Sequence, residues 1–490
     1  MKSTIDPFPG GARRVGLPGT APMRVGRAVE WVRRLSLWSV LALAAWAPLP
    51  LGSARPWAAA VLAIVAGLIV MGRGVADLAF AENEPVDLRA LGIPALLFAL
   101  ALAWAIGQCL TLAPASWQHP IWAEAQSLLS LATKGAISLD TSATRDAIVH
   151  LLLDAAAFWL GFHVAQRPEG ARAILIGIAA IGALYAGWGL IVYGTGNRTV
   201  LWFNKWAYFD DLTSTFVNRN SFATFAGLAL VTSTGLLLDT MHARIDFHQD
   251  RRIVLRSLFD LLMTRAAWLV AGIALTLTAV LLTHSRGGAL STSAGIAGLL
   301  AMILFAPSLR GPWRGGFAIA AGLGMLVIVL VSGAPTLGRI AATAWDVEGR
   351  REIYELTLEA IRNSPLLGTG LGTFKWVFPT YRTEDVPFTV EFAHNDYLEN
   401  TLELGIPAAI LLAASVVLLA IACARGVFRR RRNAIIPGIG VAASLLVGVH
   451  ACFDFSLQIP AVSLSYLLLL GAGVAQSTPT RSQAGVAAIT

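Results

Sequence analysis

Apolar residues fill long stretches of this chain, and short polar segments separate them. A helix of about 20 mainly apolar residues is long enough to cross a lipid bilayer. The pattern therefore predicts an all-α integral membrane protein with about twelve transmembrane helices. The expected spans are 36–52, 57–72, 91–112, 147–164, 173–194, 220–238, 266–284, 287–306, 316–333, 404–424, 434–451 and 459–476.

The polar segments divide the chain into a membrane domain and two tails. Residues 1–35, which contain glycine, proline and arginine, are expected to form a flexible tail, and residues 477–490 form a second one. The polytopic membrane domain would cover residues 36–476. Its largest insertion is the loop 334–403 between the ninth and tenth spans. Tyr354, Leu358 and Ile361 recur there at helical spacing, so residues 347–363 are expected to be helical.

Composition supports a membrane protein and excludes most soluble classes. Hydrophobic residues make up 56% of the 490 residues and charged residues only 13%, against about 25% charged residues in an average soluble domain. A water-soluble enzyme or a nucleic-acid-binding protein would need a much larger charged surface. The three cysteines and eight histidines show no metal-ligand spacing, so neither a metal nor another cofactor is expected.

The net charge of +8 indicates how the chain is oriented in the membrane. Lys and Arg accumulate in cytoplasmic loops of membrane proteins, and most of these residues fall in alternate connections that include both tails. Both termini are therefore predicted to be cytoplasmic. The polar segments 195–219, 284–288, 334–403 and 452–458 would then all face outward.

Two arginines stand at the predicted outer ends of helices. Arg286 lies in a tight turn between two apolar spans, and Arg219 precedes the span that begins at residue 220. Each is either an interfacial anchor or an anion contact, because guanidinium matches phosphate oxygens in bidentate geometry. Asn218 and Asn220 are candidates to cap the helix start beside Arg219.

Three histidine- or glycine-containing segments complete the set of candidates. His394, in the long outer loop, is either a surface residue or a group that takes a proton from a hydroxyl. His450 and Asp454 are spaced to share one helix face, where they would pair or line a cavity. Gly368, Gly370 and Gly372 lack a full dinucleotide motif, so a loop packed closely against a helix end is expected.

Taken together, these segments resemble the O-antigen ligase and polymerase superfamily. The resemblance covers about residues 200–475, and the order and spacing of its motifs are specific in combination. The motifs are FVNRN (216–220), HSRGG (284–288), GRREIY (349–354), NSPLLGTGLGTF (363–374), AHNDYLENTLELGIP (393–407) and HACFDF (450–455).

The resemblance implies a glycosyltransferase that moves an undecaprenyl-diphosphate-linked glycan onto an acceptor hydroxyl. The acceptor would be another glycan, a lipid A core or a protein, and the reaction would take place at the periplasmic face of the bacterial inner membrane. By this similarity His394 would be catalytic, while Arg219, Arg286 and Arg350 would bind the diphosphate. The supporting residues would be Asn218, Asn395, Glu403, His450 and Asp454.

Several functions remain open from the sequence. Polymerisation of O-antigen or exopolysaccharide repeat units is close to ligation, and no motif separates the two. A secondary transporter would carry its polar groups near the middle of the membrane, where Asp154 is the main candidate. A non-catalytic scaffold would tolerate changes at Arg219, Arg286 and His394.

Overall fold

The computed structural model describes residues 21–80, 88–130, 134–307, 311, 314–333, 339–384, 386, 389–430 and 432–477. Most of the expected N-terminal tail, residues 1–20, lies outside the described residues. Residues 478–490 of the expected C-terminal tail lie outside them as well. The described chain is a helical membrane protein, with one small two-stranded hairpin.

Each of the twelve expected apolar ranges overlaps a helix of the structure, with different bounds. These helices are α1 (Ala21–Trp46), α2 (Pro56–Phe80), α3 (Gly92–Cys109), α5 (Thr141–Val164), α6 (Pro168–Gly194), α7 (Arg219–Arg244), α9 (Ala267–Leu282), α10 (Arg286–Phe305), α11 (Arg314–Gly333), α14 (Asp396–Arg429), α15 (Ile435–His450) and α16 (Pro460–Ala475).

Shorter elements connect these helices. They are η1 (Leu51–Ser53), η2 (Ala115–Trp117), α4 (Ile121–Leu129), β1 (Thr199–Val200), β2 (Phe203–Asn204), α8 (Arg251–Met263), α12 (Arg339–Asn363), α13 (Phe374–Val377), η4 (Phe378–Thr380) and η5 (Ser456–Gln458). The expected helix 347–363 is the second part of α12.

Fewer helices of the structure meet the length and composition of a membrane span than the twelve that the sequence predicts. Within the described residues, seven helices are long and apolar enough to cross a membrane, or eight if α8 and α9 form one bent span. The helices α15 and α16 are apolar but have only 16 residues each, and the segment Arg314–Val327 of α11 is apolar as well. The coarser expectation of a polytopic helical protein is confirmed, and the number twelve stays a prediction.

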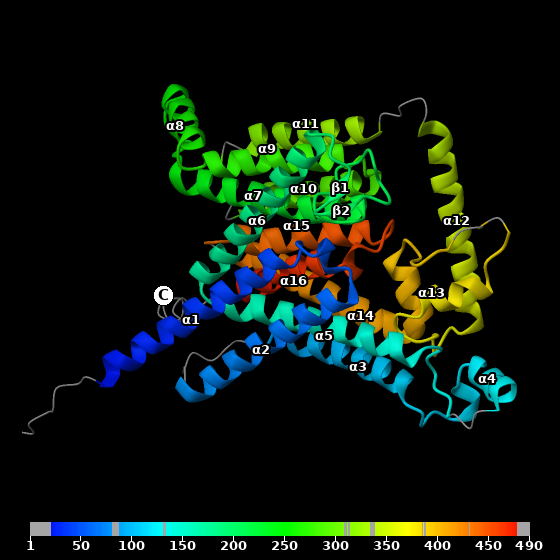
Figure 1. The fold of residues 1–490 in the computed structure, drawn as a ribbon. Coiled ribbons are helices and arrows are strands. Elements are labelled where there is room, and N and C mark those ends of the chain that lie inside the picture. The colour runs from blue at the N-terminus through cyan, green and yellow to red at the C-terminus, as the bar shows by residue number, and fades with distance from the viewer. Residues whose placement is uncertain are drawn as a thin grey trace, which may run out of the picture.

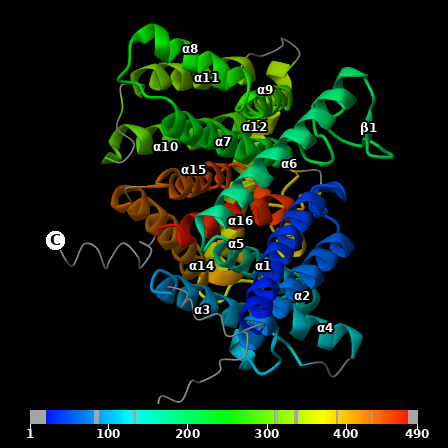
Figure 2. The same cartoon turned by 90° about the vertical axis from the view of Figure 1, so that its left-hand side faces the viewer.

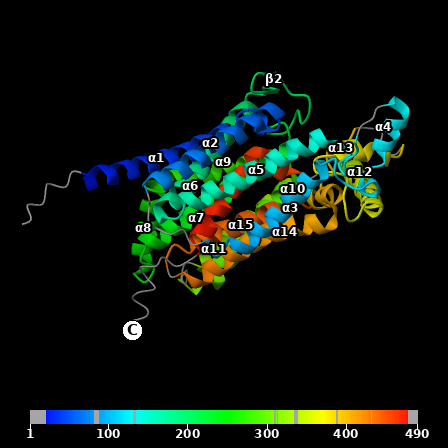
Figure 3. The same ribbon diagram turned by 90° about the horizontal axis from the view of Figure 1, so that it is seen from below.

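Successive long helices run in opposite directions, so the polar connections gather at one end of the bundle (Figure 1). This end, called the polar end below, carries α4, α12, α13, the β1–β2 hairpin and the connection from α15 to α16. The opposite end carries α8, the start of α1 and the end of α16 (Figure 3). Residues that are far apart in sequence therefore meet at the polar end.

Two helices form the centre of the bundle. Most side chains of α7 and α16 are buried, and Figure 2 shows α16 surrounded by other helices. Small residues permit this close packing, because a Cβ added at Gly161 of α5 would lie 2.7 Å from the carbonyl oxygen of Leu468 in α16. A second, smaller core under α12 and α13 includes Ile353, Phe374 and Phe378.

The glycine-rich loop packs against the start of α14, as expected. Its three glycines, Gly368, Gly370 and Gly372, all have positive φ, and the backbone N–H groups of Gly372 and Phe374 donate to Glu403 at 2.7 and 2.8 Å. Gly405 also has positive φ, and it interrupts α14. The loop thereby fixes the direction in which α14 leaves the polar end.

We expect Gly368→Ala to destabilise the fold. A Cβ there would lie 2.2 Å from the carbonyl oxygen of Glu403, and the φ of +70° is unfavourable for alanine, at a cost of ~1–2 kcal/mol before any clash is counted. The thermal unfolding midpoint of the purified protein in detergent measures the effect. Gly67→Ala is the matched control, because a Cβ at Gly67 meets nothing within 4 Å. Equal midpoints for both variants would contradict the prediction.

Candidate functional site

His394 is held in a defined orientation at the polar end. It immediately precedes Asn395, the N-cap of α14, and its φ is +53°. Its Nδ1 lies 3.1 Å from Oδ1 of Asp454, and the hydroxyl of Tyr354 donates to its carbonyl oxygen at 2.8 Å. Its ring also packs against Phe455, with the ring centroids 5.1 Å apart. Asp454 and Phe455 therefore hold the ring, and Tyr354 holds the backbone of the same residue.

Asp454 is the buried carboxylate that orients the ring of His394. It is 1% exposed and accepts the backbone N–H of Phe455 as well as the contact from His394. Burial opposes its charge, but the hydrogen bond and charge of His394 and the nearby His450 and Arg350 lower the pKa of Asp454 to about 2. An ionised Asp454 favours the tautomer with the proton on Nδ1 and leaves Nε2 of His394 to accept a proton.

Asn220 joins this pair to the start of α10. Its side-chain amide donates to Asp454, and its Oδ1 accepts the hydroxyl of Ser285 at 2.7 Å. Ser285 is the N-cap of α10 and accepts the backbone N–H of Gly288. One buried chain of hydrogen bonds therefore connects His394, Asp454, Asn220 and Ser285, which come from the starts of α14, α7 and α10 and from the α15–α16 connection.

A second buried carboxylate, Asp211, holds two more residues of the polar end. Its Oδ2 accepts Nη1 of Arg219 at 2.7 Å, and its Oδ1 lies 2.8 Å from Nδ1 of His284. Burial opposes the charge of Asp211, but the hydrogen bond from His284 and the Arg219 guanidinium outweigh it, so its pKa is lowered. Arg219 also lies over the ring of Tyr208, 5.3 Å from its centroid.

The two Asp–His pairs have the same construction. His284 has φ of +50° and precedes the N-cap Ser285, just as His394 precedes the N-cap Asn395. In each pair the aspartate is at least 95% buried and comes from a different connection. Asn220 directly follows Arg219 in the chain, and Ser285 directly follows His284. These backbone links connect the two pairs into one network.

Of the other two expected arginines, Arg350 contacts Phe453, and Arg286 precedes a glycine that lies near it. Nη1 of Arg350 in α12 donates to the carbonyl oxygen of Phe453 at 3.0 Å. Arg286 is exposed at the first position of α10, and a Cβ on the adjacent Gly287 would lie 3.5 Å from Cβ of Phe453. Among the described residues, the Arg286 side chain has no hydrogen-bond or ion-pair partner. Of the three arginines expected to bind the diphosphate, it therefore has the guanidinium that is most available to an incoming anion.

Asn218, Asn395 and Glu403, among the expected supporting residues, make backbone contacts. Asn218 is the N-cap of α7 and accepts the N–H of Asn220, as expected. Asn395 accepts two N–H groups of α14 and donates to the carbonyl oxygen of Cys452. Glu403 holds the glycine-rich loop. The contacts of these three residues position elements around His394.

The expected pairing of His450 with Asp454 does not form. The helix α15 ends at His450, so Asp454 lies in the following turn, where it contacts His394 and Asn220. His450 is 1% exposed, and neither of its ring nitrogens has a hydrogen-bond partner in the described part of the chain. The i, i+4 spacing predicts a contact only if the helix continues, and here it stops too early.

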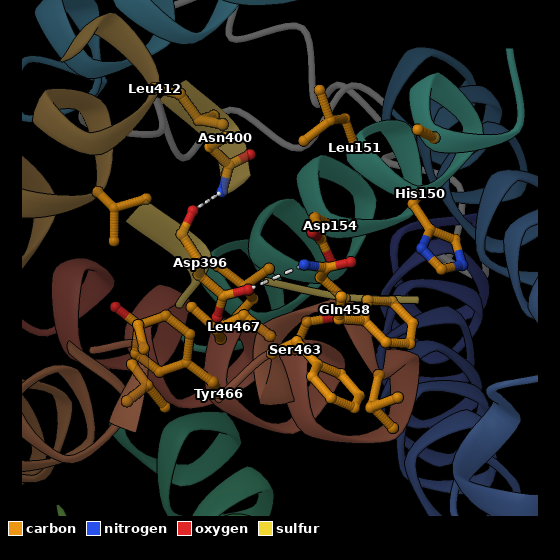
Figure 4. A pocket seen from close by; sticks show the side chains of 18 of the residues that line it. His150, Leu151, Asp154, Asp396, Asn400, Leu412, Gln458, Ser463, Tyr466 and Leu467 are labelled. Atoms are coloured by element: carbon orange, nitrogen blue, oxygen red, sulfur yellow. Dashed lines mark hydrogen bonds between the residues drawn. The ribbon is translucent and has the colours of Figure 1, made fainter. Parts of the chain in front are cut away.

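An apolar cavity of about 1950 Å³ opens beside His394. Its walls come from α2, α3, α5, α14, α15 and α16, and they include His394, Asn218 and Tyr208. Figure 4 shows a polar part of the cavity where Asp154, Asp396 and Gln458 lie close together, with Gln458 donating to Asp396 at 3.1 Å. Such a cavity is large enough for a lipid-sized substrate.

The cations that line the cavity are not the ones expected from the sequence. The residues that line it do not include Arg219, Arg286 or Arg350, but they include Arg55 and Lys375. Sequence reasoning missed these two residues as well as Asp211. The only signal for Asp211 was an aspartate pair in a polar segment beside an apolar helix.

Lowering the pH should remove a defined part of the stability that Asp454 provides. Because its pKa is lower in the folded protein than the ordinary value of 3.8, the charged carboxylate stabilises the fold above about pH 4. This contribution, ~2 kcal/mol, is lost as the pH falls toward 2. Thermal unfolding in detergent at a series of pH values should show a smaller acid-induced loss for Asp454→Asn than for wild type.

The control for this measurement is Asp210→Asn. Asp210 is 79% exposed and lies 3.6 Å from Arg198, so its replacement should leave the acid-induced loss as large as in wild type. An unchanged acid-induced loss in Asp454→Asn would contradict the role given to the buried carboxylate.

Comparison with known families agrees with the resemblance of the motifs. Residues 271–413 match the family model described as O-Antigen ligase. The matched segment extends from α9 to the middle of α14 and includes His284, Arg286, Arg350 and His394. A search of curated proteins gives no match for this chain.

Proposed function

We propose that the chain is a membrane glycosyltransferase with an undecaprenyl-diphosphate-linked glycan as donor, and the match of residues 271–413 to the O-Antigen ligase family model supports this proposal. The glycan passes to an acceptor hydroxyl at the periplasmic face, in the synthesis of lipopolysaccharide or another surface polysaccharide. The observation that carries the proposal is the position of His394, held by the buried Asp454 on the wall of the apolar cavity.

In the proposed reaction His394 acts as the general base. With its Nδ1 proton directed to Asp454, Nε2 accepts the proton of the acceptor hydroxyl. The acceptor oxygen attacks the anomeric carbon of the donor sugar, and the bond from that carbon to the diphosphate breaks with inversion. The leaving undecaprenyl diphosphate gains negative charge, which Arg286 and Arg219 stabilise together with the starts of α7 and α10.

The shape and polarity of the cavity suit a donor with a long lipid chain. Burial of apolar lipid surface against apolar walls is favourable, and the walls consist mainly of apolar side chains from six helices. The diphosphate of such a lipid would lie where the cavity reaches the polar end. This arrangement supports a lipid-linked donor rather than a soluble nucleotide sugar.

The distribution of polar groups favours a transferase over a transporter. His394, Asp454, Asn220 and Asp211 all lie at helix ends or in connections at the polar end. A secondary transporter would bind its substrate near the middle of the membrane. Asp154 is within α5, but its neighbours Asp396 and Gln458 belong to the start of α14 and to the α15–α16 connection at the polar end (Figure 4).

We expect His394→Ala to abolish glycan transfer without preventing insertion of the protein. The variant removes the group that accepts the hydroxyl proton, while the main packing core does not include this residue. Surface glycans and lipid-linked glycans of a deletion strain rescued with each variant measure the effect. His248→Ala is the matched control, because His248 is exposed in the connection before α8; it should rescue fully.

The stalled product distinguishes the two chemistries of the superfamily. Long lipid-linked chains in the His394→Ala strain indicate failed ligation, whereas single lipid-linked units indicate failed polymerisation. Full rescue by an expressed His394→Ala protein would show that the proposed site is wrong.

We expect Arg286→Lys to reduce transfer by at least about tenfold. Lysine keeps the positive charge but loses the planar, two-pronged donor geometry that matches phosphate. Transfer can be measured as the rate at which the lipid-linked donor is consumed in membranes containing equal amounts of each protein. Arg362→Lys changes another exposed arginine of the polar end and serves as control. Full activity of Arg286→Lys would contradict the bidentate contact.

A further inference from the structure

The helix α8 lies at the end of the bundle opposite the site and is sharply bent relative to its neighbour. Its axis makes an angle of 71° with that of α9, across a break of three residues. The helix α9 follows the general direction of the bundle (Figure 1). If the bundle crosses the bilayer, α8 therefore lies nearly parallel to the membrane surface.

One face of α8 is packed against the protein. Leu261 is buried there with Ile245 and Ala266, and Val254 and Leu258 pack against the same cluster. The N-cap Asp250 accepts the backbone N–H of Arg252 at 2.8 Å. This packing holds α8 in place and leaves its remaining surface outward.

The outward surface carries an apolar stripe that no part of the described chain covers. Leu255, Phe259 and Met263 follow each other at i, i+4 and i+8, so they lie on one side of the helix. They are 56%, 67% and 57% exposed, respectively. On a surface in contact with water, such a stripe would be unfavourable, because apolar area is exposed without compensation.

Arginines lie on the same side of α8 as the stripe. Arg252 and Arg256 are one turn apart and, at 100° per residue, lie beside Leu255 and Phe259 on the helix surface. Arg251 and Arg265 stand near the two ends of the helix. All four are exposed, and within the described residues none of their side chains has a hydrogen-bond or ion-pair partner. Their positive charge is therefore available to an external anionic surface.

We propose that α8 is an interfacial anchor that binds the anionic phospholipid headgroups of one membrane leaflet. Leu255, Phe259 and Met263 insert at the boundary between headgroups and acyl chains, while Arg252 and Arg256 contact lipid phosphates beside them. Exposed apolar residues combined with basic residues are typical of helices that lie in the membrane interface. This inference does not depend on the proposed glycosyltransferase activity.

The position of α8 in the chain links the proposed anchor to two long helices of the bundle. It connects α7 with α9, which pack against each other along the bundle. At the other end of the bundle, α7 begins with Arg219 and Asn220, and α9 ends shortly before His284. With 26 residues, α7 is about 39 Å long. Lipid contact at α8 therefore stabilises the pair of helices from the end opposite the site.

The test compares the full-length protein in nanodiscs of phosphatidylcholine alone and in nanodiscs that also contain phosphatidylglycerol. Anionic lipid should raise the thermal unfolding midpoint of wild type. Each arginine near an anionic surface contributes roughly a fivefold gain in binding, so Arg252→Gln combined with Arg256→Gln should weaken lipid binding about 25-fold. This double variant should lose more than half of the rise in midpoint.

The matched control removes the same charge from the other end of the molecule. Lys134 and Arg362 are exposed at the polar end, and replacing both with glutamine should leave the rise as large as in wild type. Phe259→Gln tests the apolar stripe, because its exposed side chain contributes little to packing inside the protein. This variant should lower the midpoint in both lipid mixtures.

Three results would overturn the proposal. One is an equal rise in wild type and in the Arg252→Gln, Arg256→Gln variant. Another is an absence of any rise in wild type. The third is a similar rise on adding inorganic phosphate to the detergent-solubilised protein, because it would indicate a phosphate site rather than a membrane surface.

Discussion

The hydrogen bonds of two buried carboxylates, Asp454 and Asp211, determine how the polar end is assembled. Each carboxylate needs partners, because an isolated charge in a buried position is very costly. Asp454 obtains them from His394 and Asn220, and Asp211 from Arg219 and His284. Satisfying these charges brings together the starts of α7, α10 and α14.

The location of this network at helix ends follows from the membrane environment. Within the bilayer every backbone polar group must be bonded inside the protein, so the spans are regular helices with few charges. Irregular backbone and ionisable groups are then concentrated in the connections. The glycine-rich loop illustrates this division, since its N–H groups bond to Glu403 just before α14 continues as an apolar helix. The fold thus separates a mainly apolar cavity from a polar network at the helix ends.

Sequence periodicity predicts the helices well because each depends on its own apolar residues. It also identifies His394, Arg219 and Arg286 as unusual, since each is a polar residue beside an apolar span. It does not predict the contact between Asn220 and Asp454, which joins residues 234 positions apart. It also pairs His450 with Asp454, because the spacing does not reveal that α15 ends before Asp454. Contacts that depend on the arrangement of several helices require the structure.

The network also distinguishes the three cations of the site from one another. The charge of Arg219 is largely compensated by Asp211, 2.7 Å away, and Arg350 donates to the carbonyl oxygen of Phe453. Arg286 is exposed at the start of α10, where the helix dipole adds to its positive charge. An anion that approaches the polar end therefore gains most from Arg286. We infer that Arg286 provides the binding charge, whereas Arg219, fixed by Asp211, provides orientation.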